Sequence, residues 1–174
     1  MSLALVSSSE EATRGIGRAI GDACAPGLTI LLEGDLGAGK TVLVRGIGDA
    51  LGAARVRSPS FALVNEYPTP TLHVVHADLY RLEGGEAEAL GIEEHVGAPG
   101  TLFIVEWPDR WDRPPREEVL TVRIDALDED RRLLTFAPVG EGAVRATDAL
   151  REAAERGAID GVALAGAKED AHEG

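Results

Sequence analysis

The residues best suited to chemistry form one stretch, Gly34-Asp-Leu-Gly-Ala-Gly-Lys-Thr41, which fits the phosphate-binding pattern G-x-x-x-x-G-K-[ST] at every fixed position. Glycines allow backbone conformations in which successive N–H groups point at one anion, and the N-terminus of a following helix adds its positive dipole end. Lys40 would reach the β- and γ-phosphates of a nucleotide as a point charge, and the Thr41 hydroxyl would ligate Mg²⁺. The stretch therefore predicts a nucleoside triphosphate site with its metal ion.

The segments on either side of this loop have the character that the pattern requires. Residues 28–33 form a short apolar run suited to a buried parallel strand. Residues 41–51 carry apolar side chains at helical spacing, and Gly52 is a suitable stop. An accidental glycine-rich turn is the alternative, but the chain has 21 glycines and only two lysines, Lys40 and Lys168, which makes a chance match rare. The order strand, loop, helix predicts a P-loop nucleotide hydrolase.

Two further apolar runs each end in an acid. Residues 72–77 lead into Asp78, and residues 101–105 lead into Glu106. Because the carboxyl ends of parallel strands face the ligand crevice of an open sheet, both carboxylates could lie beside the predicted metal ion. One would hold the metal or its water shell, and the other would orient the attacking water. The sequence does not separate these roles, and a solvated strand end is the alternative for either acid alone.

Two polar loops carry further candidates with open alternatives. The stretch Arg57-Ser-Pro-Ser-Phe61 lies where many nucleotide hydrolases keep the segment that senses the γ-phosphate, although a connection capped by Ser58 or Ser60 explains it equally well. A later loop holds three arginines that could stabilise phosphate charge as a kinase lid does, or could serve solubility: Arg110, Arg113 and Arg116.

His73 and His76 alternate with apolar residues and are expected at the strand surface or in packing.

The first half of the chain predicts alternating helices and strands. Ser8-Ser-Glu-Glu11 can form a capping box for a first helix, and Pro26-Gly27 ends that helix. Residues 62–67 predict a strand. Residues 85–95 predict one acidic helix with a solvated face.

The second half predicts antiparallel strands and a final helix. Residues 118–124 alternate apolar and polar side chains, and a polar turn separates them from the apolar run 133–136, so the sheet is expected to end in an antiparallel hairpin. From Gly140 the composition shifts to Ala, Gly and Glu. One amphipathic helix through Leu150 is expected there, followed by a disordered tail from Ala165 to Gly174.

Length and charge narrow the class of protein. The 174 residues fit a P-loop ATPase domain of ordinary size over residues 1–140, with a C-terminal helix and tail over residues 141–174. The formal net charge is −13, from 30 acidic and 17 basic residues. Nucleic-acid affinity comes largely from basic side chains that neutralise phosphates, so any nucleic-acid role is expected to be indirect.

The chain also lacks several signals of other classes. Cys24 is its one cysteine, which excludes an intramolecular disulfide and a cysteine zinc cluster. No apolar run approaches the ~20 residues of a membrane span, and the N-terminus lacks a basic segment followed by a hydrophobic one. A cytoplasmic location without membrane association is the expectation.

Taken together, the motifs resemble the TsaE family, the ATPases of bacterial tRNA threonylcarbamoyladenosine biosynthesis. The matches run from about Ser9 to Arg132. Beyond the phosphate loop they comprise Ser58-Pro-Ser-Phe61 with Leu63-Val64 and Tyr67, His76-Ala-Asp-Leu-Tyr-Arg-Leu82, Leu90-Gly-Ile92 and Val105-Glu-Trp-Pro108. Asp-Leu-Tyr-Arg combined with Glu-Trp-Pro at this spacing is far more specific than the phosphate loop alone.

The resemblance implies a three-layer αβα P-loop ATPase with a mostly parallel sheet and antiparallel edge strands. It would use ATP and Mg²⁺ and would work with the TsaB and TsaD proteins to sustain threonylcarbamoyladenosine formation in tRNA. Hydrolysis would be weak alone and stimulated by these partners. The protein would reach tRNA only through the complex.

The resemblance also implies roles for individual residues. Lys40, Asp78 and Glu106 would be catalytic, Thr41 and Glu106 would hold Mg²⁺, and Trp107 would shape the site or a partner surface. The phosphate-binding residues would be Leu36, Gly37, Ala38, Gly39, Lys40 and Thr41. The nucleotide contacts outside the loop would be Ser9, Glu10 and Arg131. Ser60 departs from the usual threonine but keeps the hydroxyl.

Two other classes of function remain open. A small-molecule kinase would use Asp78 to bind an acceptor and the arginine loop as a lid, so its ATP consumption would depend on the acceptor. A nucleotide-regulated binding module would use hydrolysis as a slow timer, and its partner binding would survive mutation of the catalytic acid. A regulatory GTPase is disfavoured because Asn65 is the chain's one asparagine and no Asn-Lys-x-Asp stretch reads guanine.

Overall fold

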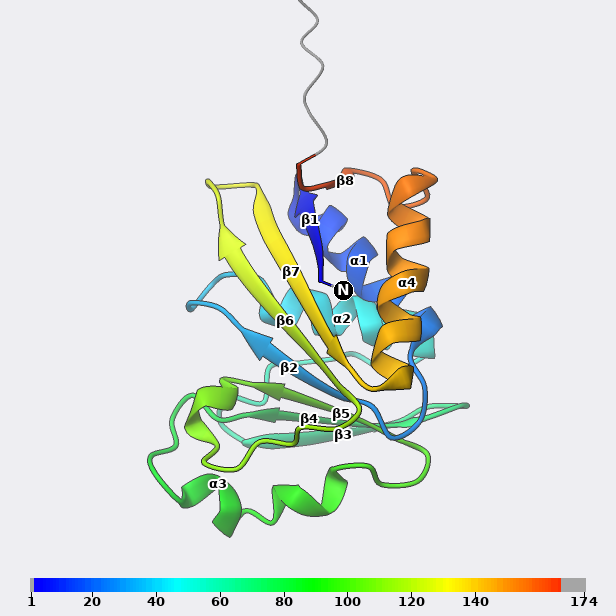
Figure 1. Cartoon of the computed structure of the whole chain (residues 1–174). Helices are drawn as coiled ribbons and strands as arrows, with labels where there is room; N and C mark the ends of the chain where they lie inside the picture. The colour runs from blue at the N-terminus through cyan, green and yellow to red at the C-terminus, as the bar shows by residue number, and fades with distance from the viewer. Residues whose placement is uncertain (1, 167–174) are drawn as a thin grey trace, which may run out of the picture.

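The computed structural model describes residues 2–166, which build one eight-stranded sheet with helices on both faces (Figure 1). The strands lie in the order β3-β4-β5-β2-β6-β7-β1-β8. Their bounds are β1 Leu3–Ser7, β2 Thr29–Glu33, β3 Val64–Pro68, β4 His73–Asp78, β5 Thr101–Glu106, β6 Val119–Ala126, β7 Arg132–Val139 and β8 Val162–Leu164.

The centre of the sheet is parallel and its two sides are antiparallel. Parallel ladders join β4 to β5, β5 to β2 and β2 to β6, so the carboxyl ends of these four strands share one edge of the sheet. Antiparallel ladders add β3 on one side and β7, β1 and β8 on the other. The predicted fold class, α/β with parallel core strands and antiparallel edges, is confirmed.

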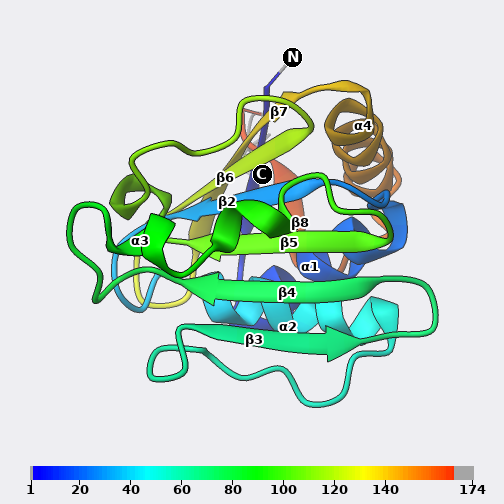
Figure 2. The same ribbon diagram turned by 90° about the horizontal axis from the view of Figure 1, so that it is seen from below.

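Helices form a layer on each face of the sheet (Figure 2). On one face lie α1 (Glu10–Ala23), α2 (Lys40–Leu51) and α4 (Glu141–Glu155), and the other face carries the short helix α3 (Glu86–Ala89) and a 3-10 turn, Ile92–His95. A second 3-10 turn, Pro108–Arg110, follows β5. The helix that follows the phosphate loop, α2, therefore belongs to the layer of long helices, and the face with α3 carries the thin layer.

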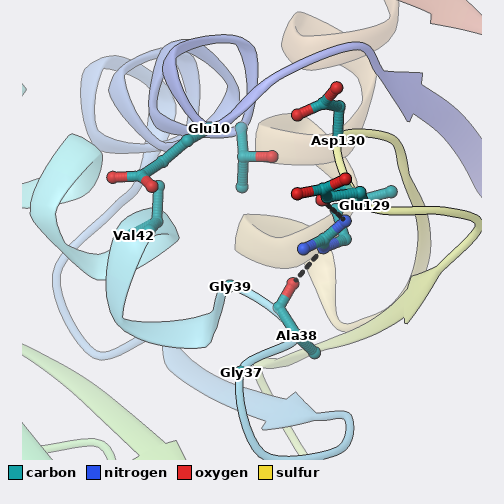
Figure 3. Close-up of a pocket in the computed structure, with 9 residues that line it drawn as sticks. Glu10, Gly37, Ala38, Gly39, Val42, Glu129 and Asp130 are labelled. Carbon is teal, nitrogen blue, oxygen red and sulfur yellow. Dashed lines mark hydrogen bonds between the residues drawn. The ribbon is translucent and has the colours of Figure 1, made fainter.

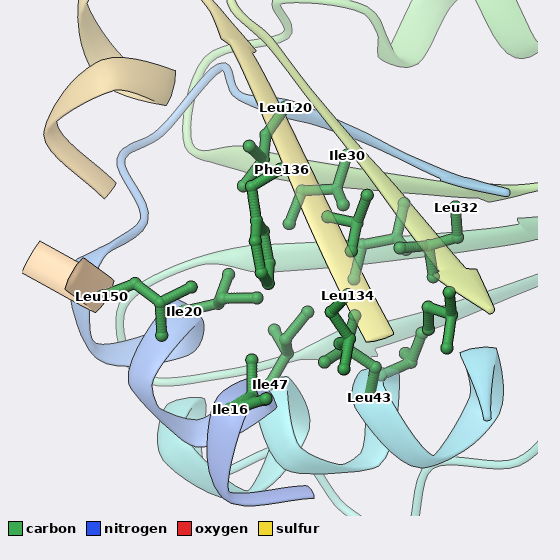
Figure 4. Close-up of a cluster of buried hydrophobic side chains, with 14 of the residues drawn as sticks. Ile16, Ile20, Ile30, Leu32, Leu43, Ile47, Leu120, Leu134, Phe136 and Leu150 are labelled. Atoms are coloured by element: carbon green, nitrogen blue, oxygen red, sulfur yellow. The ribbon is translucent and has the colours of Figure 1, made fainter. Parts of the chain in front are cut away.

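Each layer has its own hydrophobic core. The larger core joins all three long helices to the central strands (Figure 4), and its fully buried members include Ile20, Leu43, Ile47, Phe136 and Leu150. The smaller core lies under α3, where Ala87 and Ile92 pack with Phe103. Aliphatic side chains dominate both cores, as the low aromatic content of 4% requires.

Helices α1 and α2 approach so closely that three glycines lie between them. A Cβ atom on Gly46 would fall 2.0 Å from the carbonyl oxygen of Arg14, and one on Gly17 would fall 2.2 Å from that of Leu43. Gly21 would meet the carbonyl oxygen of Ile47 at 2.8 Å. This backbone contact fixes α2, and with it the phosphate loop, against the rest of the fold.

Gly46→Ala is therefore expected to lower the free energy of unfolding by about 2 kcal/mol, because overpacking of this size outweighs the helix propensity of about 1 kcal/mol that alanine gains. Urea denaturation followed by circular dichroism measures the change. Gly84→Ala is the matched control, because a Cβ atom there has no neighbour within 4 Å. Equal stability of the two variants would contradict the close-packing account.

The first helix begins differently from the prediction. Ser9, not Ser8, is the N-cap of α1, and its hydroxyl accepts a hydrogen bond from the Ala12 N–H at 3.0 Å. The predicted capping box was wrong, since the Glu11 carboxylate pairs with Arg18 at 2.7 Å instead.

The acidic helix and the C-terminal segment also differ from the prediction. Residues 85–95 form two short helical pieces, because Gly91 takes a left-handed conformation with φ 67° between them. The amphipathic helix through Leu150 is confirmed as α4, but β8 was not predicted and pairs with β1. Of the predicted disordered tail, residues 167–174 lie outside the described residues. Ala165 donates its N–H to Ala4 O at 2.9 Å.

Candidate phosphate and metal site

The glycine loop lies between the carboxyl end of β2 and the first turn of α2, as predicted. Gly37 and Gly39 have φ values of 76° and 114°, a region that favours glycine. Gly39 is the N-cap of α2, and no side chain caps the first amides of the helix. The loop therefore offers backbone N–H groups and a helix N-terminus to an anion.

Lys40 is folded back against the loop that carries it. Its Nζ donates to the carbonyl oxygens of Gly34 at 2.5 Å and Asp35 at 3.0 Å, and it lies 4.3 Å from the centre of the Trp107 ring. Burial lowers the pKa of Lys40, while the negative charge of Glu106 acts in the opposite direction. The Lys40 ammonium group therefore lies between two carbonyl oxygens of the loop and the Trp107 ring.

The two predicted acids lie side by side at the same edge of the sheet. Asp78 and Glu106 are register partners in the β4–β5 ladder. Glu106 Oε1 lies 3.5 Å from Thr41 Oγ1. Asp78 accepts hydrogen bonds from the Tyr80 N–H at 3.0 Å and the Ser60 hydroxyl at 3.4 Å. Both carboxylates line a cavity of about 240 Å³ together with the phosphate loop, so the structure brings the predicted metal and catalytic groups together.

The loop after α2 also reaches this cavity. Ser58 and Ser60 line it, and their hydroxyl oxygens are 2.6 Å apart. The next residue, Phe61, is 85% exposed and lies beneath the Arg81 guanidinium, 4.4 Å from its ring centre. Both serines are therefore placed where a γ-phosphate-sensing segment would need its hydroxyls.

Trp107 closes one side of the cavity. Its backbone takes a left-handed conformation, with φ 58° and ψ 55°, which is rare for a bulky residue. Backbone strain of this kind is concentrated at functional sites. Its ring centre lies 4.8 Å from that of Tyr80. The two rings form an aromatic wall beside Lys40.

His76 is a site residue that the sequence interpretation missed. It is fully buried in β4, and its Nε2 lies 2.8 Å from Glu106 Oε1. A carboxylate can only accept, so Nε2 carries the hydrogen of this bond. The expectation of strand surface or packing holds for His73, which is partly exposed, but His76 fixes the orientation of Glu106. One feature of the sequence could have indicated this role. His76 lies two residues before Asp78, so both side chains are on the same face of the strand.

A second cavity, of about 150 Å³, also borders the phosphate loop (Figure 3). Glu10 and Val42, at the starts of α1 and α2, line it together with Glu129 and Asp130 of the β6–β7 turn. Gly37, Ala38 and Gly39 of the phosphate loop line both cavities.

The three residues predicted to contact a nucleotide outside the loop occupy different positions. Ser9 caps α1, and Glu10 lines the second cavity. Arg131 pairs with Asp128 at 2.7 Å. Its neighbour Arg132 lines the cavity and donates Nε to Ala38 O at 3.0 Å, a support for the loop that the sequence did not indicate. Nucleotide contact by Ser9, Glu10 and Arg131 stays a prediction.

The arginine loop does not line the phosphate cavity, which is the cavity of about 240 Å³ that holds Lys40 and both acids. Arg110, Arg113 and Arg116 are absent from the lining of both cavities, and Arg110 lies 3.7 Å from Asp109. This placement favours the solubility interpretation over a lid.

The model of the family described as "Threonylcarbamoyl adenosine biosynthesis protein TsaE" matches residues 7–134. The chain belongs to the TsaE family. The matched region contains the phosphate loop, both acids, His76 and Trp107.

Individual TsaE proteins and one crystal structure show the same relationship. The chain is 37% identical to the tRNA threonylcarbamoyladenosine biosynthesis protein TsaE of Bacillus subtilis over 131 residues, 75% of this chain and 82% of that protein. It is 37% identical to the TsaE of Streptomyces coelicolor over 137 residues, 74% and 91% of the two chains. The crystal structure of Bacillus subtilis YdiB superposes with a TM-score of 0.75 at 30% identity and covers 87% of this chain and 95% of that one.

Family membership places this TsaE protein in tRNA threonylcarbamoyladenosine biosynthesis. Among residues 2–166, the structure contains no helix that is both long and apolar enough to cross a membrane.

Proposed function

We propose that this TsaE protein is a Mg²⁺-dependent ATPase that supports tRNA threonylcarbamoyladenosine formation in a complex with TsaB and TsaD. The observation that carries the proposal is the convergence of Lys40, Thr41, Asp78 and Glu106 on one cavity at the carboxyl ends of the parallel strands. The groups that would bind phosphate, hold the metal ion and orient the water then all lie within one site.

The side chains at this site fit Mg²⁺ with bound triphosphate. The Thr41 hydroxyl and the Glu106 carboxylate supply hard oxygen ligands 3.5 Å apart. When bound, Mg²⁺ would neutralise charge on the β- and γ-phosphate oxygens. Both oxygens come from rigid elements, the first turn of α2 and the end of β5.

The chain's own groups would do the remaining work. Lys40 would exchange its two contacts with neutral carbonyl oxygens for stronger contacts with anionic phosphate oxygens. Asp78, held by the Tyr80 N–H and the Ser60 hydroxyl, would orient the attacking water and accept its proton. Trp107 would exclude solvent from the Lys40 side.

The second cavity suits the nucleoside. Val42 offers an apolar contact, and the Glu10 carboxylate could accept hydrogen bonds from a ribose hydroxyl or an amino group. Arg132 would hold the loop between the two cavities through Ala38. The expectations for Ser9 and Arg131 belong to this part of the proposal.

The partner proteins would reach this site from its open side. Leu36 of the phosphate loop is 65% exposed, and Phe61, which follows Ser60 of the same cavity, is 85% exposed, so two large apolar side chains would be available to a partner. The net charge of −13 opposes a strong hold on tRNA by the protein as a whole, so partner proteins would supply most of that contact.

His76→Ala is expected to lower ATP turnover by about 10- to 100-fold and to raise the Mg²⁺ concentration needed for half-maximal rate, because partners that orient a metal ligand have effects of this size. His76→Gln, which keeps an N–H donor, should recover part of the loss. Turnover titrated with Mg²⁺ and melting temperature measured in parallel check this. A loss of stability with an unchanged Mg²⁺ requirement would contradict the positioning role.

Phosphate release from labelled ATP without any acceptor tests hydrolysis against the kinase alternative. Inorganic phosphate as the sole labelled product, formed only when Mg²⁺ is present, is the expected result. A phosphorylated product that appears only with an added small-molecule acceptor would overturn the proposal in favour of a kinase. A binding module would show partner binding that depends on ATP but persists unchanged in the Glu106→Gln variant.

A further inference from the structure

A cleft outside the phosphate site gathers four arginines in this acidic protein. It has a volume of about 410 Å³ and lies between α1, the C-terminal half of α2 and the loop that follows α2. Its charged lining residues are Arg14, Arg45, Arg55, Arg57 and Asp49. Four guanidinium groups and one carboxylate give this arginine cleft a formal charge of +3, although the chain as a whole carries −13.

Most of this positive charge is not neutralised within the fold. Arg14 holds Asp49 with two of its three guanidinium nitrogens, Nε at 2.6 Å and Nη2 at 2.9 Å, and this contact lowers the pKa of Asp49. Across residues 2–166, no carboxylate lies within ion-pair distance of Arg45, Arg55 or Arg57. In a chain with 30 acidic residues against 17 basic ones, three such arginines in one cleft indicate an anion from outside.

The backbone that carries these arginines is firmly anchored. Val56 is buried against Gly48, where a Cβ atom would fall 2.5 Å from Val56 Cγ2, and Arg45 Nε donates to Val56 O at 3.4 Å. The Tyr67 hydroxyl accepts from the Arg57 N–H at 3.0 Å and donates to Arg57 O at 3.2 Å. The backbone beneath these arginines is therefore ordered before a ligand binds, and only the exposed side chains of Arg55 and Arg57 remain to be fixed.

The number of charges indicates the class of ligand. A single carboxylate needs one bidentate arginine, whereas groups that carry several phosphate oxygens can use several guanidinium forks at once. We propose that the arginine cleft binds a phosphate-bearing ligand, either the phosphodiester backbone of an RNA strand or a free polyphosphate. This site is separate from the phosphate loop, and the proposal does not depend on ATP hydrolysis.

Two binding measurements distinguish the sources of phosphate. Fluorescence anisotropy of a labelled 12-nucleotide single-stranded RNA, in about 50 mM salt and with saturating ADP, measures binding to RNA. Calorimetric titration with inorganic tripolyphosphate, in the Lys40→Ala background so that the phosphate loop does not contribute, measures binding to a free polyphosphate. Binding of RNA alone would identify a phosphodiester ligand, and binding of tripolyphosphate alone would identify a free polyphosphate.

The test variant is Arg55→Gln with Arg57→Gln, and the matched control is Arg113→Gln with Arg116→Gln, which removes the same charge from exposed arginines outside the cleft. We expect the cleft variant to lose at least tenfold in affinity for the bound probe and the control to stay within about twofold. For RNA, the slope of log affinity against log salt should fall by about 1.4, since each neutralised phosphate of a single strand contributes about 0.7.

Melting temperatures of both variants verify that the fold is intact, and Arg45→Gln on α2 gives an independent variant on a different element. The proposal is overturned if the wild-type protein binds neither probe, or if the cleft variants bind as tightly as the control.

Discussion

Lys40→Met is expected to weaken ATP binding at least 100-fold. Among the residues that the structure describes, Lys40 supplies the one side-chain cation that lines the phosphate cavity, and a charge-assisted contact to phosphate cannot be replaced by an apolar side chain. Methionine keeps the length of the stem beside Trp107, so the fold should be retained. Calorimetric titration with ATP and Mg²⁺ measures the loss.

A thermal shift gives a second measure of the Lys40→Met result. Saturating ATP at 100 times its dissociation constant should stabilise the wild-type protein by about 2.7 kcal/mol and the variant by almost nothing. Arg113→Met is a suitable control, since it removes a positive charge outside both cavities. A dissociation constant for the Lys40→Met protein within threefold of the wild-type value would contradict the role assigned to the loop.

Glu106→Gln is expected to remove hydrolysis while sparing much of the binding. The amide keeps the shape of the side chain and can still accept from His76 Nε2, but it loses the charge that a metal ligand beside Thr41 needs. We predict a fall in turnover of at least 100-fold with ATP affinity within about tenfold of the wild-type value. Single-turnover phosphate release and calorimetry on the same protein separate the two quantities.

The control for this variant is Glu93→Gln, an exposed acid in the 3-10 turn of the thin layer. It loses the same charge at a position that does not line the cavity and should turn over normally. Normal turnover in the Glu106→Gln protein would contradict the assignment of Glu106 to the metal and require Asp78 to carry that role.

The sequence predicted the parts of the site that depend on fixed local patterns. The spacing of glycines around Lys40 and Thr41 specified a loop between a strand and a helix, and the structure has both elements in place. Asp78 and Glu106 could be placed together because each follows an apolar run, and the carboxyl ends of parallel strands meet at one edge.

The missed parts depend on tertiary contacts that local patterns do not encode. The hydrogen bond from His76 to Glu106 joins two residues that are 30 positions apart in the sequence, and no periodicity in β4 reveals the partner of His76. Arg131 and Arg132 are neighbours of the same type, so only the register of β7 decides which one faces the loop. The strand β8 has three residues and forms by pairing with β1, a contact between the two ends of the described chain.

The net charge is a sum over the whole chain and does not describe any one surface of the molecule. A net charge of −13 describes the molecule at long range, but the fold gathers Arg45, Arg55 and Arg57 in one cleft without carboxylate partners among residues 2–166. Composition could not reveal this cleft, because Arg14 joins it from a different helix. The proposed phosphate-binding role of the arginine cleft thus rests on the fold.

Phosphate release from ATP by the purified protein, alone and then with TsaB, TsaD and tRNA, tests the central claim most directly. The measurement uses no small-molecule acceptor, and TsaB and TsaD without this protein provide the background rate. We predict slow release by the protein alone, a clear rise with the partners, and no rise when the Glu106→Gln protein replaces it. A rate that does not respond to the partners would contradict the proposal of an ATPase that works through them.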